Sequence, residues 1–200
     1  NQYLYAAHSS LIMKINATTG AIIGWIGGIA GWNHPSGGAA GCTAMMASVT
    51  PGWCVGGSAQ SGNTGDGTLQ WVTGMTVDAT NDYLYVADYR RISKYVLSTG
   101  AFVGWVGGYG FTPPTGGAAG CTSMGATVAP GWCTGGEMAT TWTEDGTFSM
   151  IGGIVHDPGS NTLIVTDSGA NHVTKHSAST GAFLGWVGEI GTSPTGGAAG

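Results

Sequence analysis

Apolar and polar residues follow one another in short stretches along this chain, with no sustained helical spacing. In its central part, β-branched and aromatic residues gather in segments that are separated by Gly, Asn and Asp, the residues that favour turns. Four such segments lie at about 74–78, 83–88, 91–97 and 101–106. Short apolar segments joined by tight turns predict a four-stranded antiparallel meander, so we expect an all-β protein.

The sequence repeats itself at a spacing of about eighty residues. The segments that recur lie at 19–25, 99–105 and 180–186, at 37–42 and 116–121, and at 51–54 and 130–133. Each period therefore combines one meander with a Gly-rich insert, and a fixed period of this length is typical of repeat architectures.

The meander also carries motifs of a known family. The segments 74–78, 81–88 and 91–95 resemble the NHL-repeat blade of β-propellers, and Asn-His-Val at 171–173 falls where that family has its Asn-His-Leu signature. The inserts are similar to those of large secreted or surface NHL-repeat proteins of bacteria. This resemblance implies NHL-type β-propeller blades, each one a four-stranded antiparallel meander.

On this reading the chain divides into alternating blades and inserts. We expect a partial blade at 1–28, a Cys-pair insert at 29–64, a blade at 65–108, a Cys-pair insert at 109–143, a blade at 144–188 and a truncated insert at 189–200. A propeller closes with about four to eight blades. The expected assembly is therefore an incomplete or shared array, either a segment of a longer array or several copies in one ring or filament, with further copies of the array as partners.

The four cysteines form two pairs of equal spacing, Cys42 with Cys54 and Cys121 with Cys133. One disulfide within each insert is the prediction, and closing such a loop contributes roughly 3 kcal/mol. Disulfides persist in oxidising compartments, so we expect an extracellular or cell-surface location. A zinc site needs four suitable ligands, and no metal or other cofactor is expected because the inserts do not repeat a histidine beside their cysteines.

Composition and charge exclude several classes of partner. The chain has 39 glycines and 7 prolines among 200 residues, but a formal net charge of only −5, which indicates a folded Gly-rich protein. Its 5 Lys and Arg residues cannot neutralise a row of phosphates, which argues against nucleic acid. The longest apolar run, at 20–32, is shorter than the ~20 residues of a membrane span. The chain starts without a basic-then-apolar leader, so any secretion signal is expected outside this sequence.

Most acidic residues recur in register, which favours a structural role over catalysis. The recurring pairs are Asp66 and Asp145, Asp78 and Asp157, and Asp88 and Asp167. Aspartates at strand ends accept hydrogen bonds from nearby backbone N–H groups and set turns. Asp78, Asn81 and Asp82 offer oxygens to Ca²⁺, but the next repeat has fewer carboxylates there and turn formation explains both. His172 and His176 share a strand face about 13 Å apart, too far for a metal pair.

Five tryptophans recur and are expected to pack between blade and insert. The others, Trp32, Trp71 and Trp142, are candidate ligand-binding residues, because exposed aromatic rings often bind sugars or peptides. Tyr89, Arg90 and Arg91 are further candidate ligand-binding residues. They interrupt the repeat with a local cluster of positive charge, which marks either a partner contact or a solvated strand end.

Three functions remain from the sequence. The first is a non-catalytic extracellular scaffold, structural or adhesive, that assembles into a ring or filament. The second is a module that binds a surface glycan or a peptide through its loop aromatics. The third is an NHL-type lyase or hydrolase, but no matching His, Tyr and Arg set carries over from that family.

Overall fold

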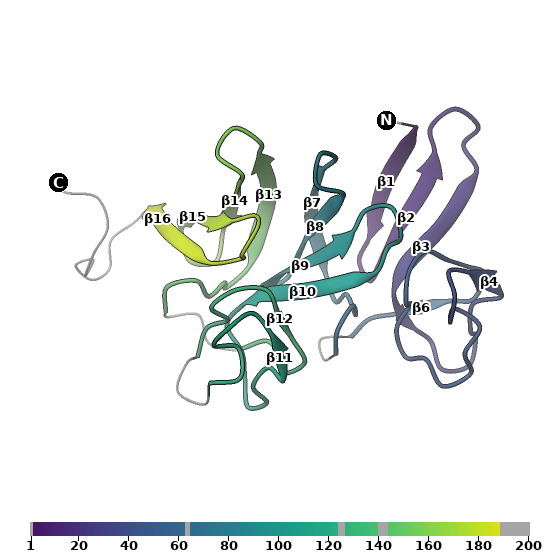
Figure 1. The fold of residues 1–200 in the computed structure, drawn as a ribbon, viewed down its shortest axis with the longest axis horizontal. Coiled ribbons are helices and arrows are strands. Elements are labelled where there is room, and N and C mark those ends of the chain that lie inside the picture. The colour runs from purple at the N-terminus through teal and green to yellow at the C-terminus, as the bar shows by residue number, and fades with distance from the viewer. Residues whose placement is uncertain (1, 63–64, 124–126, 140–143, 189–200) are drawn as a thin grey trace.

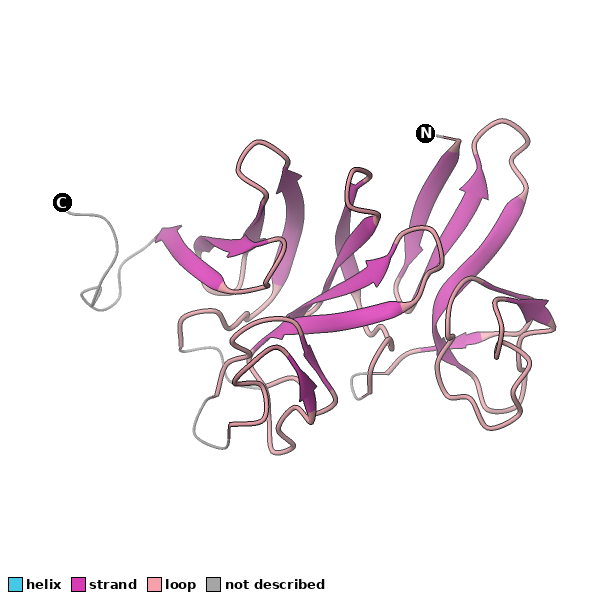
Figure 2. Cartoon of the chain, viewed as in Figure 1, coloured by secondary structure: helices cyan, strands magenta, loops and turns pink. Residues whose placement is uncertain are grey.

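A computed structural model describes residues 2–62, 65–123, 127–139 and 144–188. These residues form strands and loops only, as Figure 2 shows, which confirms the all-β prediction. In those four ranges, no helix is long and apolar enough to span a bilayer. Trp142 and the truncated insert at 189–200 lie outside the described residues.

Three antiparallel sheets follow one another along the chain and stand side by side (Figure 1). The first sheet contains β1 (Tyr3–His8), β2 (Leu11–Asn16) and β3 (Ile22–Ile29). The second contains β7 (Val72–Asp78), β8 (Tyr83–Asp88), β9 (Arg91–Val96) and β10 (Phe102–Gly107). The third contains β13 (Ile151–Asp157), β14 (Thr162–Asp167), β15 (His172–Ser177) and β16 (Phe183–Gly188). The predicted four-stranded meander is confirmed, and the described residues form no closed barrel or propeller.

The inserts extend the first two sheets, which the sequence did not predict. Their short strands are β4 (Gly37–Gly38), β5 (Cys54–Val55), β6 (Ala59–Gln60), β11 (Gly116–Gly117) and β12 (Cys133–Thr134). β5 and β12 pair with the last meander strands, β3 and β10, and β6 also pairs with β3. Each insert therefore continues the sheet that precedes it in the chain.

Two hydrophobic core clusters lie between successive sheets, and a third packs the second insert against Trp105, around Cys121 and Cys133. Between the first and second sheets, the cluster contains Ile12, Ile26, Trp53, Leu69, Leu84, Val86, Tyr95 and Leu97. Between the second and third sheets, it contains Tyr85, Ala87, Ile92, Val106, Trp132, Phe148, Ile151, Leu163, Val165 and Ala178. Most members occupy corresponding repeat positions, for example Ile12 and Ile92, or Trp53 and Trp132. The same interface is thus built twice.

One buried position differs in chemistry between the second and third sheets. His176 of β15 stands where the second sheet has Tyr95, and both side chains are buried. The His176 ring lies 5.4 Å from the Phe148 ring and 5.5 Å from the Phe183 ring, centre to centre. Burial lowers the pKa of His176 to about 4, partly offset by the contact with the Gly181 carbonyl.

We predict an acid-sensitive third sheet because of His176. Its pKa is lower in the folded state than in the unfolded state, so the unfolded state binds more protons as the pH falls from about 6.5 to about 4. Over this window the free energy of unfolding should drop by about 3 kcal/mol more in the protein than in His176→Leu, which cannot titrate. Urea unfolding at pH 7 and pH 4 measures this difference. Equal pH dependence in both would contradict it.

Candidate functional site

The first insert joins the first sheet to the second through two neighbouring residues. Cys54 pairs with Trp25 of β3 and so belongs to the first sheet. Trp53 precedes it and reaches the second sheet, where its indole Nε1 donates to the Leu97 carbonyl at 3.1 Å. Its backbone N–H donates to the Thr99 carbonyl at 3.0 Å. We call this arrangement, in which Trp and Cys bond to successive sheets, the clasp.

The second insert builds the same clasp between the second and third sheets. Cys133 pairs with Trp105 of β10. The Trp132 indole Nε1 donates to the Ala178 carbonyl at 3.2 Å, and the Trp132 backbone N–H donates to the Thr180 carbonyl at 3.0 Å. Both clasps therefore use corresponding atoms, as the recurrence of Pro-Gly-Trp-Cys at 51–54 and 130–133 indicates.

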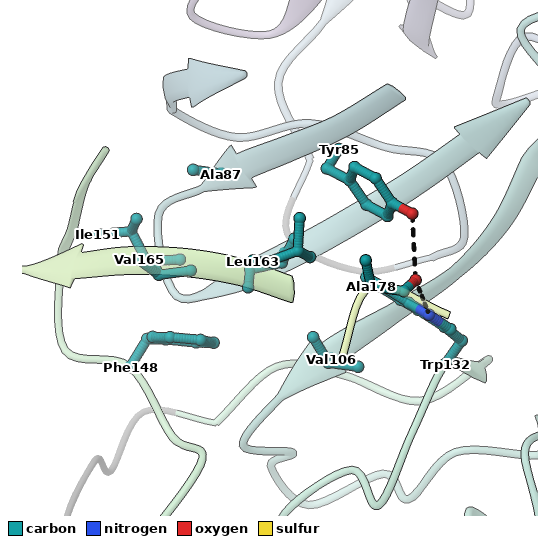
Figure 3. Packing of buried hydrophobic residues seen from close by; sticks show 10 residues of the cluster. Tyr85, Ala87, Val106, Trp132, Phe148, Ile151, Leu163, Val165 and Ala178 are labelled. Carbon is teal, nitrogen blue, oxygen red and sulfur yellow. Dashed lines mark hydrogen bonds between the residues drawn. The ribbon is translucent and has the colours of Figure 1, made fainter. Parts of the chain in front are cut away.

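Three donors converge on the Ala178 carbonyl at the second junction. Figure 3 shows the Trp132 indole and the Tyr85 phenol directed at this oxygen, and the Tyr85 hydroxyl donates at 3.1 Å. The Lys94 ammonium donates to the same oxygen at 3.2 Å. Because Tyr85 and Lys94 belong to the second sheet and Ala178 to the third, each of these bonds ties two sheets together in a buried setting.

The lysine beside each clasp is buried. Lys94 Nζ lies 3.7 Å from the centre of the Tyr83 ring, a cation–π contact. Burial lowers the pKa of Lys94 to about 8, partly offset by the negative charge of Asp78. Burial also lowers the pKa of Lys14, whose Nζ donates to the Ser98 carbonyl at 3.2 Å. Both ammonium groups are thus engaged with the following sheet.

A small cavity of about 140 Å³ adjoins Lys94. It is lined by Asp78, Asn81, Tyr83, Tyr85, Lys94, Asn161 and Ser179. This volume falls well below the roughly 300–1,000 Å³ of ordinary small-molecule sites. The pKa of Lys94 is therefore lowered by burial at the packed junction between two sheets, and the adjoining cavity is too small for an ordinary substrate.

Both predicted disulfides are present, Cys42–Cys54 and Cys121–Cys133. In each pair the second cysteine is the clasp residue, so the bridge fixes the position of the neighbouring tryptophan. Cys42 and Cys121 are also wholly buried, which places the bridge inside the packed insert.

A glycine of the Thr-Gly-Ala repeat lets each clasp approach the following sheet. Gly100 and Gly181 have positive φ angles of 76° and 80°. A Cβ atom at Gly100 would lie 2.8 Å from the Trp53 backbone nitrogen, and one at Gly181 would lie 2.9 Å from that of Trp132. The turn after β9 and β15 therefore needs glycine for two reasons, backbone conformation and close approach.

Asp88 and Asp167 act as expected on nearby backbone N–H groups, whereas Asp66 accepts from the distant Gly135 N–H and Asp145 from the Trp186 indole. Asp88 Oδ1 accepts from the Gln70 and Trp71 N–H groups at 2.8 and 2.9 Å. Asp167 accepts in the same way from Ser149 and Met150 at 2.7 and 2.9 Å.

The two carboxylates of the oxygen cluster at 78–82 already accept hydrogen bonds, Asp78 within its own turn and Asp82 from the Ser98 N–H. Asp78 Oδ1 accepts from the Thr80 and Asn81 N–H groups, both at 3.1 Å. Burial alone would raise the pKa of Asp78, but hydrogen bonds from Asn81 and Thr80 lower it overall. Across the described ranges, no three His, Cys, Asp or Glu residues come together as a metal site.

The structure brings three of the candidate ligand-binding residues together. The Trp71 and Tyr89 rings stack with their centres 6.3 Å apart at an interplanar angle of 22°. Arg90 Cζ lies 4.7 Å from the centre of the Tyr89 ring. We call Trp71, Tyr89 and Arg90 the aromatic column. Trp32 is exposed but belongs to the first insert and is not part of the column.

For Arg91, the prediction of a partner contact or a solvated strand end is wrong. Its side chain is buried, with Nε donating to Asp88 Oδ2 at 3.1 Å and Nη2 donating to the Thr68 carbonyl. The charge is satisfied inside the second sheet. The sequence did not reveal this because the first sheet has an apolar residue, Leu11, at the same position.

One exposed aromatic residue was missed. Phe111 of the second insert is fully exposed and corresponds to Trp32 of the first insert. Aligning the inserts on Gly37 and Gly116 would have paired them, since the residues between match one for one.

Neither protein-family models nor the sequences of curated proteins match this chain.

We predict that Trp132→Ala destabilises the protein by about 3–5 kcal/mol, because it removes a large buried ring and its bond to Ala178. The matched control, Trp32→Ala, truncates an exposed tryptophan of the other insert and should change stability by less than about 0.5 kcal/mol. Urea unfolding under oxidising conditions measures both. Similar effects of the two substitutions would show that the clasp contributes little.

Proposed function

We propose that this chain is a non-catalytic structural repeat protein of the extracellular space, in which inserts lock successive β-sheets into a rigid scaffold. The observation that carries this proposal is the repetition of the clasp. At both junctions a tryptophan of the insert donates through its indole and its backbone to the following sheet, while the adjacent cysteine pairs with the preceding one.

The roles of the charged groups support a scaffold over an enzyme. A reaction centre needs groups with tuned pKa values that converge on an accessible cleft. Here the lysines of lowered pKa donate to carbonyls of the next sheet, and Asp88 and Asp167 hold backbone N–H groups at corresponding positions. These groups serve the repeat.

The NHL-like motifs support the further proposal that each sheet is a propeller-type blade in an incomplete or shared array. Two intramolecular disulfides are compatible with an extracellular or cell-surface location. A scaffold exposed to the environment would benefit from covalent bridges that hold a Gly-rich insert in place.

If the inserts lock the scaffold, reducing the protein should weaken it. Each bridge closes a loop with a sequence separation of 12, which corresponds to about 3 kcal/mol. We expect Cys121→Ser/Cys133→Ser to lower the free energy of unfolding by about that amount and to make the second insert the first site of protease cleavage. The matched variant Cys42→Ser/Cys54→Ser should expose the first insert instead. Unchanged stability and cleavage in both variants would contradict the proposed locking role.

The aromatic column favours a second function, binding of a glycan. Trp71 is 59% exposed, yet its ring stacks on the Tyr89 ring. Arg90, which contacts the Tyr89 ring, is held in turn because its Nε donates to the Ser149 carbonyl at 3.0 Å. A large aromatic face held in one orientation can stack against the apolar face of a sugar ring at low entropic cost.

For this second function, Trp71→Ala should weaken glycan binding by about tenfold or more, as is usual for an aromatic residue at the centre of a binding site. Glycan-array screening followed by titration calorimetry with the best ligand measures the effect. Trp32→Ala provides the control and should bind as the unaltered chain does. Absence of any glycan ligand, or equal loss in both variants, would remove this candidate.

A further inference from the structure

The outer face of the third sheet has the composition of an interface but lies uncovered by other described residues. Ile164 of β14 is 37% exposed, whereas Tyr85, at the same position in the second sheet, is 1% exposed. Val187 of β16 is 69% exposed, whereas its counterpart Val106 is 1% exposed. We call this surface the trailing face.

A hollow on the trailing face lies where the corresponding part of the second sheet is filled. The hollow has a volume of about 360 Å³, and its lining includes Thr166, Val173 and Val187. Their counterparts in the second sheet, Ala87, Ile92 and Val106, pack in one cluster with Phe148 and Ile151 of the third sheet. The internal junction therefore shows what this kind of face accepts, namely the apolar side chains of another sheet of the same repeat.

The first sheet has part of the corresponding surface, also uncovered by other described residues, but no strand at the position of β13 and so no counterpart of Ile151. Leu4 of β1 is 59% exposed, whereas Leu84 and Leu163, at the same position in the other sheets, are wholly buried. Ile22 of β3 is 60% exposed and corresponds to Phe102, which packs against the first junction cluster. We call this surface the leading face.

A lysine on the trailing face indicates the polar part of the contact. Lys175 is exposed, but Lys14 and Lys94 at the same position are buried and donate to the Ser98 and Ala178 carbonyls of the sheet that follows. In the first sheet, the positions that correspond to Ala178 and Ser98 are Ala17 and Thr18, and both residues are exposed. The trailing face thus combines an apolar patch with a cation.

We infer that a second copy of this chain docks its leading face, around Leu4 and Ile22, on the trailing face of the first, around Ile164 and Val187. This inference rests on the proposed scaffold function and names its partner. The two faces are different surfaces, so the contact is head-to-tail and each added copy leaves one face of each kind free. Such a contact leads to open-ended growth or to a ring.

Sedimentation velocity of the oxidised 200-residue chain over a roughly hundredfold concentration range tests this inference. The chain should associate as concentration rises. Leu4→Asp and Val187→Asp should each weaken self-association by about tenfold or more, because each buries an unpaired charge in the contact. Leu4→Ala and Val187→Ala should weaken it less. Phe111→Asp, in the second insert, is the matched control and should associate as the unaltered chain does.

An equimolar mixture of Leu4→Asp and Val187→Asp gives the sharpest result. The first variant keeps an intact trailing face and the second an intact leading face, so the mixture should form pairs and stop there. A chain that stays monomeric throughout, a Leu4→Asp variant that associates with itself as strongly as the unaltered chain, or a mixture that forms no pairs would overturn the inference. If the chain is strictly monomeric but its stability still depends on the disulfides, the inference fails and the proposed scaffold stands. The trailing face would then be covered by a sheet of a longer array.

Discussion

The bond between an insert tryptophan and a carbonyl of the next sheet is the constraint on which the rest of the structure depends. A β-sheet of this repeat has an apolar face that it cannot bury alone, so neighbouring sheets must meet face to face. Apolar packing is not directional, but a buried indole N–H needs an acceptor at one place. Trp53 and Trp132 therefore fix the register of each junction as well as contributing to its core.

Several unusual local features follow from that constraint. Glycine is needed at Gly100 and Gly181 so that the turn of the next sheet can reach the tryptophan backbone. The lysines beside the clasps remain buried because carbonyls and aromatic rings surround their ammonium groups. The disulfides hold an insert that has few large side chains of its own.

The sequence predicted the features that depend on neighbouring residues. Strands such as 83–88 were found because apolar and turn-forming residues alternate over short distances, and the cysteine pairs because their equal spacing repeats. It did not predict the short strands at 37–38 and 116–117, since Gly-Gly has no strand preference and pairs only when the insert folds back. Arg91 was misread because one of its two acceptors, the Thr68 carbonyl, lies 23 residues away, although the other, Asp88, is close in sequence. The stacking of Trp71 on Tyr89 could have been found, because pairing Val72 with Asp88 places these residues side by side.

The adjacency of tryptophan and cysteine in each clasp has a mechanical consequence. A force that separates two sheets is transmitted through the indole and its backbone to the next peptide bond, and from there into a covalently closed loop. The hydrogen-bonded tryptophan and the disulfide-bonded cysteine are adjacent residues, so only one peptide unit can extend between them. Tension across a junction between sheets would thus be carried by the tryptophan hydrogen bonds and then by the disulfide. The redox state of the surroundings would therefore determine how far the junction extends before it breaks.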